Sequence, residues 1–441
     1  MSGSPAEKKL SIFEDPSKAF QVFSFIQQVA IIIGSIFLAK SAMPIENIGK
    51  FETLLYLGQF VSLFWISGLT QAFHAIYPKV ALVERKSFIS TTFTIFLFLS
   101  IASSLILILG RPLLLPFLIE SPQIEGLYWF CLYTAINTPS MLIPSLLMLR
   151  GNSKELMRFS LFYGIGYILV FFLNFLFGGK LINLLILLNI YTLTLLLMSG
   201  GMALTLNLNA YRLKWAKRLF LIGSPLIGYS IISGMALIYD AWLVQRLYTP
   251  KAIFAIFRYG GREFPLTVTL AIGLGTALIP IISRNLKEGL EKIKSRSQRL
   301  YPLVFGTSIV LVLISKFIFP IIFSTDFISS AAIFNIYILI IISRMIYPHI
   351  ILLGLRKTKA LLYISIIELF INIIGSTILG FKFGLLGIAG GVFIAHIIGK
   401  IAQIIYLRKK LGIRLDQYLS VKRYLFYSLA LILAWGISTY L

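Results

Sequence analysis

Residues 181–206 read LINLLILLNIYTLTLLLMSGGMALTL, an apolar run without a single charged side chain. Such a run predicts a membrane-spanning helix, because about 20 apolar residues cross the hydrocarbon core of a bilayer. Similar runs recur from near Ala19 to Tyr440, and hydrophobic residues make up 58% of the chain. A water-soluble core cannot bury that much apolar surface, so the sequence predicts a multi-pass membrane protein.

The apolar runs are continuous and do not alternate with period two, which favours helices over a membrane β-barrel. We therefore predict an all-α protein with about 13 transmembrane helices, within a range of about 12 to 14. The expected spans are 18–39, 52–77, 88–110, 126–149, 158–177, 181–206, 219–243, 252–282, 301–323, 329–353, 359–380, 385–407 and 423–440.

The distribution of basic residues predicts the orientation of these helices. With a cytoplasmic N-terminus, only a few of the 40 Lys and Arg residues fall in external loops, namely Lys40, Lys50, Arg111, Lys180, Arg246, Lys251 and Lys382. Basic residues prefer the cytoplasmic side of a membrane. The net charge of +24 then reflects topology and attraction to anionic lipids rather than nucleic-acid binding. No signal peptide is evident, and we expect a location in the cell inner membrane.

Short motifs recur in the same order at a nearly constant spacing. AIYP at 75–78 corresponds to ALIP at 277–280, MLIP at 141–144 corresponds to MIYP at 345–348, and Asn174 corresponds to Asn372. This pattern predicts duplication of a six-helix unit, with the two copies related by an axis along the membrane normal. We expect an N-terminal lobe at 1–206, a cytoplasmic linker at 207–218, a C-terminal lobe at 219–407, and a basic loop with an extra helix at 408–441.

The sequence lacks the motifs of common enzymes and metal sites. No phosphate-binding loop, dinucleotide-binding fingerprint or zinc-protease motif is present. Cys131 is the single cysteine, and His74, His349 and His396 fall on three different predicted helices. The expected loops leave little room for a catalytic domain. We therefore predict neither an enzyme nor a metal site, and no cofactor.

Charged residues inside the spans are informative, because each costs about 2.5–3.5 kcal/mol on insertion scales unless it faces a cavity or a partner. Lys316 and Lys400 lie near enough to span ends for their side chains to reach an interface, so we do not expect them to bind substrate. Away from the ends of the spans, the remaining charged residues are Arg258, Arg262, Arg344, Asp240, Glu263 and Glu368.

Arg258 and Arg262 lie one helical turn apart on one face, at a depth where Gly260 and Gly261 interrupt the helix. A broken helix beside charge near the midplane is typical of transporter substrate sites. Two guanidinium groups at one level suit a phosphate or pyrophosphate. The alternative is a structural network in which Asp240 neutralises Arg258 and Glu263 pairs with Arg262 or another helix, and Glu368 is a further candidate charge partner.

Polar residues also follow one face of the second predicted helix. In lipid such a stripe must face protein or water, so it indicates either hydrogen bonds between helices or contact with a sugar. The candidate polar groups of a cavity, taken from the first, second and tenth spans, are Gln27, Gln28, Gln59, Gln71, His74 and Arg344.

Three segments carry a resemblance to a known family. They are YDAWLVQRLYTPKAIFAIFRYGGREFP at 239–265, ALIPIISR at 277–284 and FINIIGSTILGFKFGLLGIAGG at 370–391. The chain resembles polysaccharide flippases of the multidrug/oligosaccharidyl-lipid/polysaccharide exporter superfamily, most clearly over 219–407. The resemblance implies two six-helix lobes around a central cavity that opens to alternate sides, with Arg258 and Arg262 facing that cavity.

The same resemblance implies a substrate made of a sugar chain linked to polyprenyl pyrophosphate. Between Lys18 at its start and Lys40 after its end, the first span carries no charged residue, whereas lipid II flippases of the superfamily usually carry a cationic residue there, which favours a flippase for O-antigen or capsule repeat units. The alternatives are a lipid II flippase or a cation-coupled multidrug exporter, and, more remotely, a membrane glycosyltransferase or polymerase. Expected partners are the lipid-linked oligosaccharide, membrane lipids and other polysaccharide assembly proteins. Coupling to Na⁺, H⁺ or the membrane potential stays open.

Overall fold

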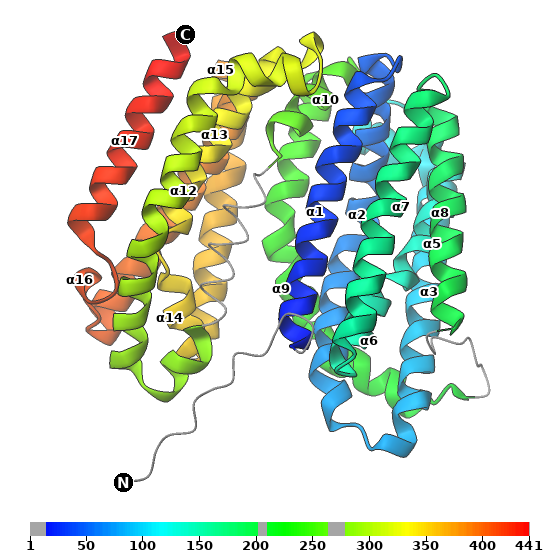
Figure 1. The fold of residues 1–441 in the computed structure, drawn as a ribbon, viewed down its shortest axis with the longest axis horizontal. Coiled ribbons are helices and arrows are strands. Elements are labelled where there is room, and N and C mark those ends of the chain that lie inside the picture. The colour runs from blue at the N-terminus through cyan, green and yellow to red at the C-terminus, as the bar shows by residue number, and fades with distance from the viewer. Residues whose placement is uncertain (1–14, 202–209, 263–277, 441) are drawn as a thin grey trace. The chain divides into compact units, whose positions relative to one another are not determined.

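The computed structural model describes residues 15–201, 210–262 and 278–440, and within these ranges the regular structure is entirely helical (Figure 1). The first part contains α1 (Pro16–Lys40), α2 (Ile45–Ile76), η1 (Tyr77–Lys79), η2 (Leu82–Glu84), α3 (Arg85–Leu109), α4 (Arg111–Ile119), α5 (Leu127–Ser140), α6 (Leu142–Leu149), α7 (Ser153–Leu176) and α8 (Leu181–Gly201). The second part contains α9 (Leu213–Leu247), α10 (Lys251–Gly260), α12 (Leu286–Ile322), η4 (Thr325–Phe327), α13 (Ile328–Arg344), α14 (Pro348–Gly354), α15 (Thr358–Leu411), α16 (Leu415–Tyr418) and α17 (Val421–Tyr440). The predicted all-α fold is confirmed.

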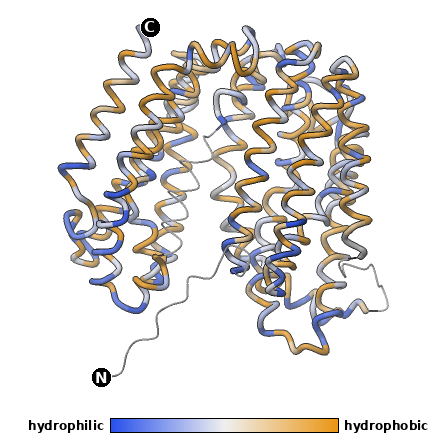
Figure 2. Tube along the Cα trace, viewed as in Figure 1, coloured by the Kyte–Doolittle hydropathy of each residue, from blue (hydrophilic) through white to orange (hydrophobic). Residues whose placement is uncertain are grey.

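Among the described residues, nine helices are long and apolar enough to cross a membrane. The two arms of α9, Leu213–Ile232 and Gly234–Leu247, meet at a bend of 42° and together pass the same test. Apolar residues cover most of the length of these helices, and hydrophilic residues gather near some helix ends, such as the start of α12 (Figure 2). The chain is a multi-pass membrane protein, and the predicted count of about 13 helices is roughly consistent with this structure.

Two compact units make up the structure. Unit 1 comprises Met1–Met43, Leu57–Phe117 and Ser121–Ser230, and unit 2 comprises Pro44–Tyr56, Leu118–Glu120 and Ile231–Leu441. Three of the boundaries fall inside helices, since α2, α4 and α9 each contribute residues to both units. The predicted linker at 207–218 lies elsewhere in the chain, and its first three residues, 207–209, are outside the described residues.

Unit 1 is a bundle in which α1 packs along α7, and α5 packs against α3 and α8. Aromatic rings fill the contact at one end of this bundle, where Phe73 of α2 stacks on Phe88 of α3 with ring centroids 5.5 Å apart. Gly68 of α2 lets the first half of α9 pack closely against α2. A Cβ on Gly68 would lie only 2.6 Å from the backbone nitrogen of Ile227 in α9. These contacts bury one face of each helix and leave the other to lipid.

Unit 2 is built around α12, α13, α15 and α17. The 54-residue α15 is a hairpin, because Gly384 adopts φ 63° and ψ −140° and reverses the chain. A Cβ on Gly391 would lie 2.3 Å from the backbone nitrogen of Ser376 in the opposite arm. The arms therefore pack backbone to backbone and correspond to the expected spans 359–380 and 385–407.

The last helix, α17, packs within unit 2. The Tyr424 hydroxyl donates to the Ile342 carbonyl at 2.9 Å, and the Asn335 amide lies 3.2 Å from Ser438 Oγ. These two contacts fix α17 to α13 near both of its ends. The expected thirteenth span at 423–440 thus corresponds to a helix that belongs to the bundle.

Both units break a helix at the repeated proline motif. In unit 1 the break at Met141 separates α5 from α6, and in unit 2 the break at 345–347 separates α13 from α14, which begins at Pro348. The other repeat, at 75–78 and 277–280, is described only in part, because residue 277 lies outside the described residues. The matching breaks support the predicted duplication.

Candidate functional site

The candidate site lies where α10 ends. Gly260 is the last residue of α10, and a Cβ there would lie 2.6 Å from Ile333 Cβ and 2.7 Å from the Ser330 carbonyl oxygen in α13. Only glycine permits this approach of α10 to α13, and the following Gly261 closes the helix. The sequence correctly predicts an interruption at this glycine pair. Arg258 therefore lies in the last turn of α10, and Arg262 lies just beyond its end.

One carboxylate joins the two arginines. Glu52 Oε2 lies 3.3 Å from Arg258 Nε, and Glu52 Oε1 lies 2.6 Å from Arg262 Nη2. The Glu52 side chain is 2% exposed, whereas those of Arg258 and Arg262 are 26% and 21% exposed. The Arg262 guanidinium also lies over the Tyr259 ring, 4.2 Å from its centroid. One buried carboxylate thus contacts both guanidinium groups.

Glu52 comes from the first part of α2, which packs on α10 within unit 2. Glu46 accepts hydrogen bonds from the backbone N–H groups of Lys251 and Ala252, each at 3.0 Å, and so caps the start of α10. A Cβ on Gly49 would lie 1.9 Å from the Lys251 carbonyl oxygen. One residue after Glu52, the Thr53 hydroxyl accepts from the Gln245 side chain at 2.8 Å.

Glu52 is not among the site residues predicted from the sequence, because the predicted second span starts at residue 52. The structure begins α2 at Ile45, directly after Pro44, so Glu52 lies about two turns inside the helix. Glu263, the partner proposed for Arg262, lies outside the described residues.

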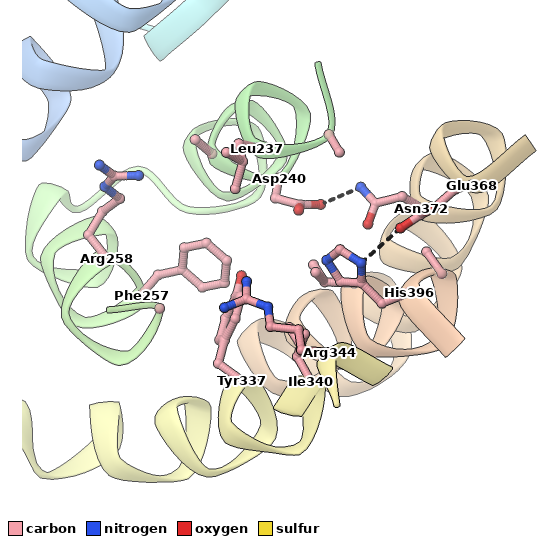
Figure 3. Close-up of a pocket in the computed structure, with 15 residues that line it drawn as sticks. Leu237, Asp240, Phe257, Arg258, Tyr337, Ile340, Arg344, Glu368, Asn372 and His396 are labelled. Carbon is pink, nitrogen blue, oxygen red and sulfur yellow. Dashed lines mark hydrogen bonds and ion pairs between the residues drawn. The ribbon is translucent and has the colours of Figure 1, made fainter. Parts of the chain in front are cut away.

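A cavity of about 410 Å³ opens beside this cluster, entirely within unit 2 (Figure 3). It brings Arg258 together with Arg344 of α13, a pairing that the sequence did not predict. Its other polar and aromatic lining residues are Asp240, Glu368, Asn372, His396, Phe257 and Tyr337.

The acidic residues of this cavity are held by neighbours other than Arg258. An oxygen of Asp240 accepts a hydrogen bond from the Asn372 amide at 3.1 Å, and Glu368 Oε1 lies 2.8 Å from His396 Nδ1. Figure 3 shows Asp240 directed toward Asn372 and Arg258 directed away from it. The neutralising carboxylate that contacts Arg258 is Glu52, in place of the Asp240 considered from the sequence. Carboxylates in such a cavity can exchange a proton or hold a monovalent cation.

Unit 1 contains a second cavity, of about 310 Å³. Its lining combines neutral polar groups with aromatic rings: Phe20, Phe23, Gln27, Ile66, Ser67, Thr70, Gln71, His74, Ser140, Met141, Pro144, Ser145, Phe159 and Tyr163. The Gln27 amide donates to the Tyr163 hydroxyl at 3.3 Å, and the Gln71 amide donates to Ser67 Oγ at 3.2 Å. The polar stripe on the second helix therefore faces a cavity over part of its length.

The remaining candidates lie apart from these two cavities. Gln28 and Gln59 are exposed, and neither is among the lining residues of the cavities described above. Lys316 is exposed on α12, and Lys400 Nζ lies 3.1 Å from His349 Nδ1. Within 15–201, 210–262 and 278–440, no three His, Cys, Asp or Glu side chains are grouped so that they could hold a metal ion.

The fold is similar to that of several solved transporters. The lipid II flippase MurJ in its inward closed conformation aligns with a TM-score of 0.69 and 17% identity, over 95% of this chain and 92% of that one. An inward-facing multidrug resistance MATE family transporter of the MOP superfamily aligns with a TM-score of 0.63 and 13% identity, over 89% of this chain and 98% of that one.

A MOP superfamily transporter from Pyrococcus furiosus aligns with a TM-score of 0.58 and 12% identity, over 92% of this chain and 99% of that one. No protein-family model matches the sequence, and no curated protein matches it. At these identities the three structures establish the fold and leave the substrate to be argued from the residues.

Proposed function

We propose that this chain is a flippase of the multidrug/oligosaccharidyl-lipid/polysaccharide exporter superfamily, which moves a polyprenyl-pyrophosphate-linked oligosaccharide across the inner membrane by alternating access. In this proposal the N-terminus is cytoplasmic, as the distribution of basic residues predicts. Arg258 and Arg262 bind the pyrophosphate. Arg344, which lines the same cavity as Arg258, adds a third positive charge.

The observation that carries the proposal is the arginine pair at the end of α10. Both guanidinium groups lie at one place inside a membrane protein and stay partly exposed, at 26% and 21%. Charged side chains at such a place are costly and are retained where they serve an ion or substrate. A pyrophosphate offers several oxygens to the planar forks of two arginines, and its two negative charges match theirs.

The cavity in unit 1 supports a sugar-bearing substrate. It offers amides, hydroxyls and aromatic rings but no Lys, Arg, Asp or Glu side chain. Such linings suit an uncharged polyhydroxylated ring, since hydroxyl and amide groups can replace its bonds to water. We propose that Gln27, Gln71 and His74 contact sugar residues during transport, while the polyprenyl tail stays in lipid. Gln28 of α1 and Gln59 of α2 are exposed and line neither cavity, so we assign them no contact with the sugar.

A cation-coupled exporter of drugs is the second candidate function. It is favoured by Asp240 and Glu368, two carboxylates in the cavity of unit 2. The two functions differ in what Arg258 and Arg262 do, since a cationic drug gains nothing from an arginine pair. Efflux of a cationic dye that survives loss of both arginines and stops with Asp240→Asn would favour the exporter.

Complementation of a flippase-null strain tests the primary proposal. Arg258→Lys and Arg262→Lys should each reduce export of the labelled glycolipid although the charge is unchanged, because an ammonium lacks the planar fork. The comparison requires equal protein abundance in the membrane. Arg158→Lys supplies the matched control, since Arg158 lies near the start of α7 in unit 1, outside both cavities.

A further inference from the structure

We infer that one end of unit 2 is a docking surface for the head groups of anionic phospholipids. The surface consists of residues 284–299 and 408–423, which we call the basic platform. These two segments contain twelve Lys and Arg residues and only three acidic residues, Glu288, Glu291 and Asp416. Such an excess of positive charge favours a negatively charged partner. The inference is independent of the substrate that the protein transports.

The fold brings the two segments together although they lie far apart in the sequence. Lys294 Nζ donates a hydrogen bond to the Asp416 carbonyl oxygen at 2.7 Å, which joins the start of α12 to α16. Gly412 adopts φ 67° directly after α15 and lets the chain turn back toward α16. The Tyr301 ring of α12 lies 6.2 Å from the Tyr424 ring of α17. The basic platform is therefore a single surface of unit 2.

The apolar side chains of the platform are already buried. Leu290 and Ile293 of α12 belong to the same core cluster of unit 2 as Ile413 and Leu419, which flank α16. An amphipathic helix that inserts into a membrane surface needs a free apolar face. Here that face packs inside the protein, whereas basic side chains such as Lys287, Arg299 and Lys410 are exposed. The platform therefore offers charge to a partner, and not an apolar wedge.

The position of the platform along the helices favours lipid over an acidic protein. The second arm of α15 carries Arg408, Lys409 and Lys410 in its last turn, directly after an apolar stretch. Helix α12 likewise passes from Arg299 into its apolar part. Both helices are long and apolar enough to cross a membrane. Basic side chains at the ends of such helices lie at the level of the lipid head groups.

The charge of the platform exceeds what the orientation of the helices requires. In unit 1 the turn at 79–87, which follows the related motif at 75–78, has three basic residues and one acidic residue. The platform has nine more basic than acidic residues. Clusters of about four to eight Lys and Arg residues beside a membrane helix are typical of binding to anionic lipids. We therefore assign lipid binding to the platform of unit 2 and not to the turn of unit 1.

Lipid binding by the purified full-length chain in a neutral detergent tests this inference. Native mass spectrometry would measure the dissociation constant of the first bound lipid, with phosphatidylglycerol and phosphatidylcholine titrated separately. The two lipids share a phosphodiester, but the choline cancels its charge. Wild type should bind phosphatidylglycerol more tightly, and this preference should fall as salt is added.

The test variant removes four exposed lysines of the platform, as Lys287→Gln/Lys409→Gln/Lys410→Gln/Lys422→Gln. It should bind phosphatidylglycerol at least about tenfold more weakly and phosphatidylcholine as wild type does. Glu291→Gln works in the opposite direction, because it removes an exposed acidic side chain from the platform. It should bind phosphatidylglycerol up to about fivefold more tightly.

Matched controls come from unit 1. Lys79→Gln/Lys86→Gln/Lys154→Gln/Lys217→Gln removes the same charge from four exposed lysines outside the platform. Glu155→Gln, at an exposed residue in the first turn of α7, is the control for Glu291→Gln. Both controls should bind phosphatidylglycerol as wild type does.

Three results would overturn the inference. Equal loss of phosphatidylglycerol binding in the two four-lysine variants would assign the attraction to the net charge of the whole chain. Unchanged affinity in Glu291→Gln would do so even if the four-lysine platform variant did not fold. A wild type that binds both lipids equally would exclude a lipid surface, and binding of polyglutamate to the platform would then identify an acidic protein as the partner.

Discussion

Replacing Gly391 with alanine should force apart the arms of the α15 hairpin, whereas the same change at Gly390 should not. A Cβ on Gly391 would lie 2.3 Å from the Ser376 backbone nitrogen and 2.5 Å from its Cα, and a Cβ on Gly390 would lie 3.9 Å from the nearest atom, Leu379 Cδ1. Non-bonded carbon atoms prefer separations of about 3.5–4.0 Å, so the arms at Gly391 must move by more than about 1 Å.

The size of the effect follows from two opposing terms. Overpacking typically costs about 1–3 kcal/mol, and a clash with backbone atoms lies at the upper end because no side-chain rotation relieves it. Alanine in place of glycine within a helix gains up to about 1 kcal/mol. We expect Gly391→Ala to lose about 2 kcal/mol of stability and Gly390→Ala to be neutral or slightly more stable. Separation of the arms should also disturb the 2.8 Å contact between Glu368 and His396.

Thermal unfolding of both variants and wild type, purified in one detergent, measures the difference. Gly391→Ala should melt below wild type and Gly390→Ala at or above it. Changes in melting temperature of opposite sign for these two adjacent residues would exclude a general effect of alanine on the helix. Equal melting temperatures for the two variants would show that the arms do not pack at Gly391 as described.

Two further predictions concern polar and charged side chains of unit 2. Asn372→Leu removes the amide that donates to Asp240 at 3.1 Å and should cost about 1–3 kcal/mol, measured as a lower melting temperature; unchanged stability would mean that the bond contributes nothing. Lys316→Ala and Lys400→Ala should leave glycolipid export close to wild type, because neither side chain is assigned to substrate. Lost export at normal abundance would refute that expectation, above all for Lys400, whose Nζ lies 3.1 Å from His349 Nδ1.

The helical architecture could be predicted because each element is specified locally. Apolar runs specify the spans, and the glycine pair at 260–261 specifies the end of α10. The chain reversal at Gly384 lies between the expected spans 359–380 and 385–407. In each case the decisive physical term, hydrophobic length or glycine backbone freedom, is a property of a short segment.

The partners of the charged residues could not be predicted in the same way. Sequence gives the depth of a residue along a helix but not the helix that it faces. Asp240 and Arg258 were therefore reasonable partners on depth alone, yet Asp240 bonds to Asn372 and Arg258 contacts Glu52. The segment 45–52 contains Glu46, Asn47, Lys50 and Glu52, which resembles a polar loop. Its carboxylates are satisfied by α10 and the two arginines, so it forms part of α2.

Transport in proteoliposomes tests the central claim most directly. Purified wild type and Arg258→Ala/Arg262→Ala, reconstituted at equal density, would be compared for movement of a polyprenyl-pyrophosphate-linked oligosaccharide between leaflets, measured by a membrane-impermeant reagent that modifies only the outer sugars. Lys316→Ala would serve as a charge-loss control. We expect protein-dependent movement with wild type and the control, and none above protein-free vesicles with the double variant. Movement at the wild-type rate by the double variant would show that the arginines do not bind the substrate and form a structural ion-pair network.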